Sequence, residues 1–92
     1  MIETMNQLAV SLAGHDKEHI YAIVREEGDL VCLADGKTKT LEKPKKKNRK
    51  HIRRITHLPP GIGDKLQLVR QDCDLVHVLR LYQAYQKQKE KR

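Results

Sequence analysis

Hydrophobic residues at every second position, or in short runs, dominate the first sixty residues of the chain. Leu8, Val10 and Leu12 alternate with smaller residues, which is the period of a strand with one buried face. Runs rich in hydrophobic and β-branched residues follow at 19–25 and 30–34, and a glycine-containing turn follows each of them. We therefore predict three strands joined by hairpins, and after the third strand the two-residue turn Asp35-Gly36.

Two more short strands are predicted at residues 38–42 and 51–57, with a basic loop at 43–50 between them. Five short strands with tight turns indicate a mainly β fold. The specific prediction is a small SH3-like five-stranded barrel, because closure of the sheet removes exposed strand edges. This barrel is assigned to residues 1–57.

The segment that follows the predicted barrel interrupts the strand pattern. Pro59 and Pro60 lack backbone donors and glycines follow them, so residues 58–71 are predicted to be a linker. Within it, residues 64–69 fit either a helical turn or a strand.

Residues 72–92 are predicted to form an amphipathic α-helix, from about residue 75 to residue 88, and a basic tail. Asp72 or Asp74 can cap the helix by accepting backbone N–H groups. Its apolar face is expected to cover the barrel; the alternative is a contact with a protein neighbour. The apolar positions are Leu75, Val78, Leu79, Tyr82 and Tyr85. The basic residues that complement the helix dipole are Lys87, Lys89, Lys91 and Arg92.

The composition limits what so short a chain can do. The 92 residues suffice for one small domain, and they include no Phe, no Trp and three Tyr. Few aromatic platforms are thus present for stacking bases, which favours recognition of phosphate and shape. The two cysteines, Cys32 and Cys73, form no metal or disulfide framework, and no apolar run is long enough to span a membrane. We expect a soluble, cytoplasmic protein.

Positive charge is concentrated in residues 43–54, which we call the basic segment. It contains eight of the nineteen Lys and Arg residues and no Asp or Glu, whereas the other eighty residues sum to −1. Such a field indicates a polyanionic partner, and RNA or DNA is the first to consider. Since Arg53 and Arg54 are adjacent in a predicted strand, only one of them is expected to join the binding surface. The candidate RNA-binding residues are Lys37, Lys39, Lys43, Lys45, Lys46, Lys47, Arg49, Lys50, His51, Arg53 and Arg54.

Residues 10–24 (VSLAGHDKEHIYAIV), with a strand, a Gly-x-Asp-Lys turn and a second strand, resemble a KOW motif. Residues 33–55 resemble its continuation in small bacterial KOW-domain proteins, so the resemblance covers about residues 7–57. It implies an SH3-like barrel that binds ribosomal RNA and is associated with the ribosome, with neighbouring ribosomal proteins as further partners of the C-terminal helix. The position after the turn lysine, commonly Gly in KOW motifs, is Glu18 here.

The chain offers no pattern typical of an enzyme or of a cofactor site. His15, Asp16 and His19 lack further ligands at metal-site spacing, and no glycine-rich phosphate loop is present. We expect a non-enzymatic RNA-binding protein without cofactors. The alternatives are a protein-interaction module that uses the barrel and helix, and a basic loop that binds an anionic membrane surface. Charge alone does not separate RNA from DNA.

Overall fold

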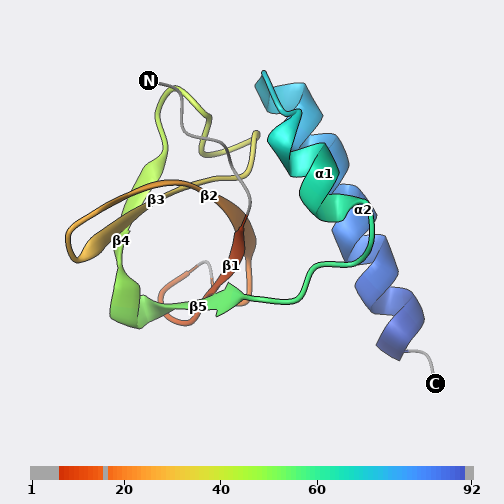
Figure 1. Ribbon diagram of the computed structural model, residues 1–92. Coiled ribbons are helices and arrows are strands. Elements are labelled where there is room, and N and C mark those ends of the chain that lie inside the picture. Colours follow the sequence, from red (N-terminus) through yellow and green to blue (C-terminus); the bar gives the residue numbers. More distant parts are fainter. Residues whose placement is uncertain (1–6, 16, 91–92) are drawn as a thin grey trace.

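A strongly curled antiparallel sheet packs against two helices in the computed structural model of Figure 1. The structure describes residues 7–15 and 17–90. The strands lie in the order β4-β3-β2-β1-β5. Their bounds are Leu8–Ser11 (β1), Ile20–Glu27 (β2), Leu30–Ala34 (β3), Lys45–Asn48 (β4) and Ile52–Ile55 (β5). The 3-10 turn η1 (Arg49–His51) joins β4 to β5, and the helices are α1 (Ile62–Gln67) and α2 (Asp72–Glu90).

The expected mainly β architecture, a five-stranded antiparallel sheet followed by a C-terminal helix, is confirmed. Some predictions concern residues outside the described part of the chain. These are residues 1–6 of the predicted barrel, Asp16 in the first turn, and Lys91 and Arg92 in the basic tail. The side chain of Lys89 lies outside it as well.

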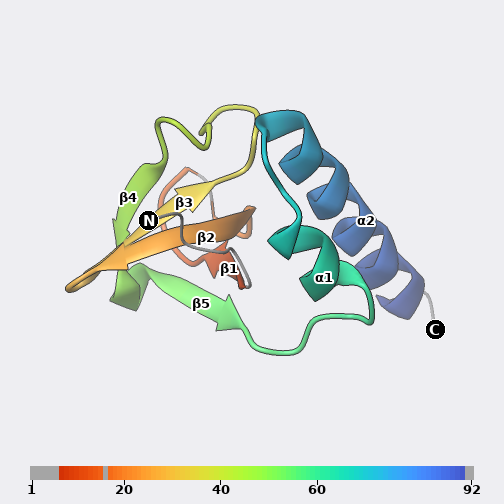
Figure 2. The ribbon, with the colours of Figure 1, turned by 45° about the horizontal axis from the view of Figure 1, so that its top comes forward.

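Each face of the sheet carries its own hydrophobic cluster. The first cluster joins the sheet to both helices, which lie together on one side of the strands (Figures 1 and 2). The second lies on the other face, around which the sheet curls. Strand β2 is thus buried on both faces over residues 20–23, which explains why its hydrophobic residues are consecutive. The first cluster includes Leu8, Ala22, Leu66, Leu75 and Tyr82. The second consists of Ala9, Tyr21, Ile23, Val31, Leu33 and Ile52.

The sheet is not closed into a barrel. Its edges are β4 and β5, and no backbone pairing joins these two strands among the residues that the structure describes. Lys47 lies opposite Val31 of the second cluster, so its side chain points to the inner face of the curl. There Lys47 Nζ donates to Ser11 Oγ of β1 over 2.6 Å. The hydrogen bond between Lys47 and Ser11 therefore spans the opening between β4 and β5, where no backbone pairing closes the sheet.

The fourth strand lies later in the sequence than predicted. Residues 38–42 form turns and bends, whereas the segment predicted as the loop 43–50 supplies β4 and the start of η1. Lysine has low β propensity, but pairing with the buried strand β3 overrides it. The prediction of a two-residue hairpin turn at Asp35-Gly36 is therefore wrong, because these residues begin the longer connection 35–44.

The predicted linker also contains regular structure. Residues 62–67 form α1, so the question left open for residues 64–69 is settled mainly in favour of helix. Ile62 and Leu66 are buried in the first cluster, and this packing stabilises so short a helix despite the nearby glycines.

Helix α2 begins at Asp72, slightly earlier than its hydrophobic period indicates. Asp74 Oδ2 accepts the backbone N–H groups of Arg70 and Gln71 at 3.1 and 3.3 Å, which satisfies donors at the helix start. The predicted apolar positions are buried against the sheet as far as Tyr82, while Tyr85 is 39% exposed. The expectation that the helix covers the sheet is therefore confirmed.

The turn between β1 and β2 places a non-glycine residue in a left-handed conformation. Glu18 has φ of 70°, and its N–H donates to Ser11 O over 2.7 Å. For a residue with a Cβ this conformation costs about 1–2 kcal/mol. The tight turn thus forms at the position where KOW motifs commonly have glycine.

We expect Glu18→Gly to raise the free energy of unfolding by about 0.5–1 kcal/mol, because relief of the strain exceeds the added entropy of the unfolded chain. Thermal unfolding followed by circular dichroism measures the gain. Glu18→Gln is the control, since it removes the charge and keeps the Cβ. An equal gain in both variants would show that charge, and not backbone strain, limits this turn.

Candidate nucleic-acid interface

The basic segment lies on β4, η1 and β5 and is held at several points by the backbone. Arg49 N donates to Asp29 O over 2.9 Å, and Lys50 N donates to Asn48 Oδ1 over 3.1 Å. His51 O accepts the N–H of Leu12 over 2.9 Å. The backbone of the segment from β4 to η1 is therefore held in place by hydrogen bonds to the neighbouring turns.

Lys47 has a structural contact that the sequence did not indicate. Besides Ser11 Oγ, its Nζ donates to Ala13 O over 3.1 Å, and the hydroxyl of Ser11, which is only 1% exposed, donates to the same carbonyl. A buried polar group of this kind costs free energy when it loses a partner. Lys47 therefore stabilises the curl of the sheet. Lys45, which is also half-buried, lies on the same face of β4.

The carboxylate of Glu26 pairs with two arginines of the basic segment. Arg54 and Arg49 both donate to Glu26 Oε1, and Arg54 Nη1 also donates to Gln7 Oε1 over 2.6 Å. Hydrogen bonds from Arg54, then from Arg49, hold the pKa of the Glu26 carboxyl below its usual value. One carboxylate thus positions two guanidinium groups where β2, η1 and β5 meet.

Glu27 does the same for a second pair of cations. Arg25 Nε donates to Glu27 Oε2 over 2.7 Å, and Lys46 Nζ lies 3.4 Å from Glu27 Oε1. The hydrogen bond from Arg25, followed by the charge of Lys46, lowers the pKa of the Glu27 carboxyl. These exposed pairs add little to stability, but they offset part of the local positive charge.

The remaining cations of the basic segment are exposed. No side-chain hydrogen bond or ion pair joins Lys43, Lys50 or Arg53 to any residue in the part of the chain that the structure describes. Arg53 lies opposite Val10, on the face that packs against the helices, and Arg54 lies opposite Ala9 on the other face. The two arginines therefore point to opposite faces, as their adjacency predicted.

Lys37 and Lys39 are positioned by the carboxylate of Asp35. Asp35 Oδ1 accepts the backbone N–H groups of Lys37 and Lys39 at 2.9 and 3.0 Å, and Oδ2 accepts from His19 Nε2 at 2.9 Å and Thr38 Oγ1 at 3.1 Å. Burial acts to raise the pKa of the Asp35 carboxyl, but these four hydrogen bonds outweigh it and hold that pKa below its usual value. Asp35 therefore remains ionised at neutral pH and fixes the loop.

Two of the predicted site residues, Lys37 and Lys39, lie apart from the basic segment. Lys37 and Lys39 belong to the loop after β3, and Lys37 lines a hollow against α2. His51 is exposed at the end of η1. The structure thus spreads the predicted residues over two regions.

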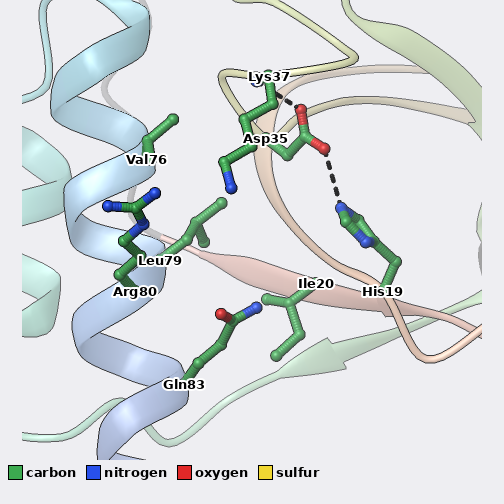
Figure 3. Close-up of a pocket in the computed structure, with 8 residues that line it drawn as sticks. All are labelled: His19, Ile20, Asp35, Lys37, Val76, Leu79, Arg80 and Gln83. Carbon is green, nitrogen blue, oxygen red and sulfur yellow. Dashed lines mark hydrogen bonds and ion pairs between the residues drawn. The ribbon is translucent and has the colours of Figure 1, made fainter.

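Sequence reasoning missed two polar residues of α2 that face this hollow. Arg80 and Gln83 line it together with Lys37 and His19 (Figure 3). The available signal was the spacing of Arg80, Gln83 and Lys87, which places them on one side of a helix. It went unused because the helix was considered mainly for its apolar face.

The sequence also raised the chemistry of the histidines and of the two cysteines. His19 bonds Asp35 and packs against Tyr21 with ring centroids 4.6 Å apart, and residues 7–15 and 17–90 contain no cluster of three or more His, Cys, Asp or Glu suited to a metal ion. Cys32 is a buried free thiol and Cys73 an exposed one.

No protein-family model matches this chain, and no curated protein matches it either. Among the described residues, no helix has the length and apolar character that crossing a membrane requires.

Proposed function

We propose that this protein is a non-enzymatic RNA-binding protein of the KOW type, cytoplasmic and associated with the ribosome, that contacts structured ribosomal RNA through its basic segment. The observation that supports it best is the charge left after internal pairing. Glu26 pairs with Arg49 and Arg54 of the basic segment, and Glu27 pairs with Lys46, so two carboxylates are shared by three of the eight cations. Exposed Lys43, Lys50 and Arg53 remain available for phosphates.

The proposal includes an SH3-like fold that stays open between β4 and β5. Three features favour it: the strand order, the short 3-10 connection between the two edge strands, and the contact of Lys47 with Ser11 across the opening. Selectivity would then come mainly from the shape of folded RNA and not from stacked bases, because two of the three tyrosines, Tyr21 and Tyr82, are buried and Tyr85 alone is exposed.

The test uses Lys43→Gln/Lys50→Gln, a double variant that avoids the cations with structural contacts. We expect its affinity for ribosomal RNA to fall about tenfold near 0.1 M salt, and its salt slope to decrease by about 1.4–1.8, since each lost phosphate contact contributes about 0.7–0.9. Filter binding of labelled ribosomal RNA over a range of KCl concentrations gives both values.

The control is Lys65→Gln/Arg70→Gln, which removes the same charge from exposed positions on α1 and beyond it. It should retain the affinity of the natural protein. A natural protein that fails to bind ribosomal RNA even at low salt overturns the proposal, and co-sedimentation with ribosomes that survives RNase would favour the protein-interaction alternative.

A further inference from the structure

Adjoining shallow hollows run along α2 and reach the sheet at both ends of the tract. The first, about 50 Å³, lies between the start of β2, the loop after β3 and the helix, and Lys37, Arg80 and Gln83 line it. The second, about 380 Å³, shares Arg80 and Gln83 and continues along α2 to Lys87. Because neighbouring hollows share lining residues, they form one tract on the surface.

A third hollow, also about 380 Å³, extends this tract to β5 and the β1–β2 turn. It shares Gln86 with the second hollow, and Arg53 and Lys17 supply its positive charges. Arg53 therefore belongs both to the basic segment and to this tract. We call the tract the seam, and its basic and amide residues are Lys17, Lys37, Arg53, Arg80, Gln83, Gln86 and Lys87.

The α2 side of the seam is a strip of hydrogen-bond donors. Arg80, Gln83, Ala84 and Lys87 follow the i, i+3, i+4, i+7 spacing and therefore share one side of the helix. All four are exposed, and the helix has no Asp or Glu from residue 75 to residue 89. The small side chain of Ala84 leaves room for a ligand to approach the helix.

The cations of the seam have little internal neutralisation. In Figure 3 Lys37, from the loop after β3, and Arg80, from α2, extend into the same space between the loop and the helix. The nearby carboxylate of Asp35 already accepts four hydrogen bonds, from His19, Thr38 and two backbone N–H groups. Glu18 is the other carboxylate that lines the seam among the residues that the structure describes, and in this part of the chain five cations and two anions line it.

We propose that the seam binds the phosphate backbone of the RNA that the basic segment contacts, and thereby makes the helical layer part of the interface. The inference rests on the proposed function. From residue 80 to residue 87 the helix rises about 10 Å, which corresponds to about three nucleotides of one strand at 3.4 Å each. Donors without free acceptors suit phosphate oxygens, and the shared Arg53 makes the two surfaces continuous.

The test is Arg80→Gln/Lys87→Gln, measured with labelled total ribosomal RNA by filter binding. Both positions are exposed and glutamine keeps the helix propensity, so the fold should persist. We expect an affinity loss of about tenfold near 0.1 M KCl and a salt slope lower by about 1.4–1.8. Gln83→Glu, a second variant that places a carboxylate within the strip, should also weaken binding.

The control Lys65→Gln/Arg70→Gln removes two charges elsewhere and should bind as the natural protein does. An unchanged RNA affinity of the Arg80→Gln/Lys87→Gln variant overturns the proposal that the seam binds RNA. An equal loss of RNA affinity in the control also overturns it, because it would indicate a general effect of charge. In the first case, a loss of affinity in Lys43→Gln/Lys50→Gln alone leaves the proposed function standing. Absence of RNA binding by the natural protein overturns both.

Discussion

Gly36→Ala is expected to lower the free energy of unfolding by about 3–5 kcal/mol, which is a large part of the stability of a domain of this size. Gly36 has φ of 82°, where a Cβ causes strain. A Cβ at this position would also lie 2.6 Å from the backbone oxygen of Asp72 and 2.9 Å from Val76 Cγ2. Since the first of these is a backbone atom in the first turn of α2, the helix itself would have to move.

The control for this experiment is Gly61→Ala. Gly61 has φ of 90°, and a Cβ there would meet nothing within 4 Å, so this variant reports backbone strain without a clash. We expect it to cost about 1–2 kcal/mol. Urea unfolding measures both values, and equal losses would contradict a tight contact between the loop and α2.

Asp35→Ala should cost about 2–4 kcal/mol, because it leaves the N–H groups of Lys37 and Lys39 and the side chain of His19 without their acceptor. Asp35 is 5% exposed, so solvent replaces these bonds poorly. Asp29→Ala is the control: it removes the same charge from an exposed turn and should change stability by less than about 0.5 kcal/mol.

The loss of stability in Asp35→Ala should depend on pH in a defined direction. The pKa of Asp35 is lowered in the folded state, so its contribution is fully present above the unfolded pKa of about 3.9 and disappears as the pH falls through the lower folded pKa. The difference between the natural protein and Asp35→Ala should therefore be constant from pH 7 to about 5 and shrink below about pH 4. A difference that keeps its full size at pH 2 would contradict this role of the carboxylate.

The hydrophobic pattern was sufficient to predict the strands and the helix that build the two clusters. Leu30–Ala34 was predicted at its observed bounds, and the apolar period of α2 identified the residues that pack on the sheet. Local pattern failed for β4 because a run of lysines carries no hydrophobic period. Its pairing depends on β3, which lies more than ten residues earlier in the chain.

The sequence was sufficient to predict the positive charge of the candidate interface, but not the ion pairs that its cations form. The sequence places eight cations close together, but it does not indicate that Glu26 and Glu27, some twenty residues earlier, pair with them. Nor does it indicate that Lys37 and Arg80 line one hollow, since this depends on how the loop after β3 packs on α2. These are contacts between distant segments, which short-range periodicity does not encode.

The lysine side chains of β4 have a consequence for the behaviour of the protein in solution. An edge strand with free backbone groups is a template on which other chains add strands and aggregate, and repeated positive charge along such an edge prevents this. Lys46 points outward from this edge beside Glu27. Replacing these lysines by neutral residues would therefore promote self-association of the chain as well as altering its electrostatic field, and the colloidal stability of the protein depends on the same cations.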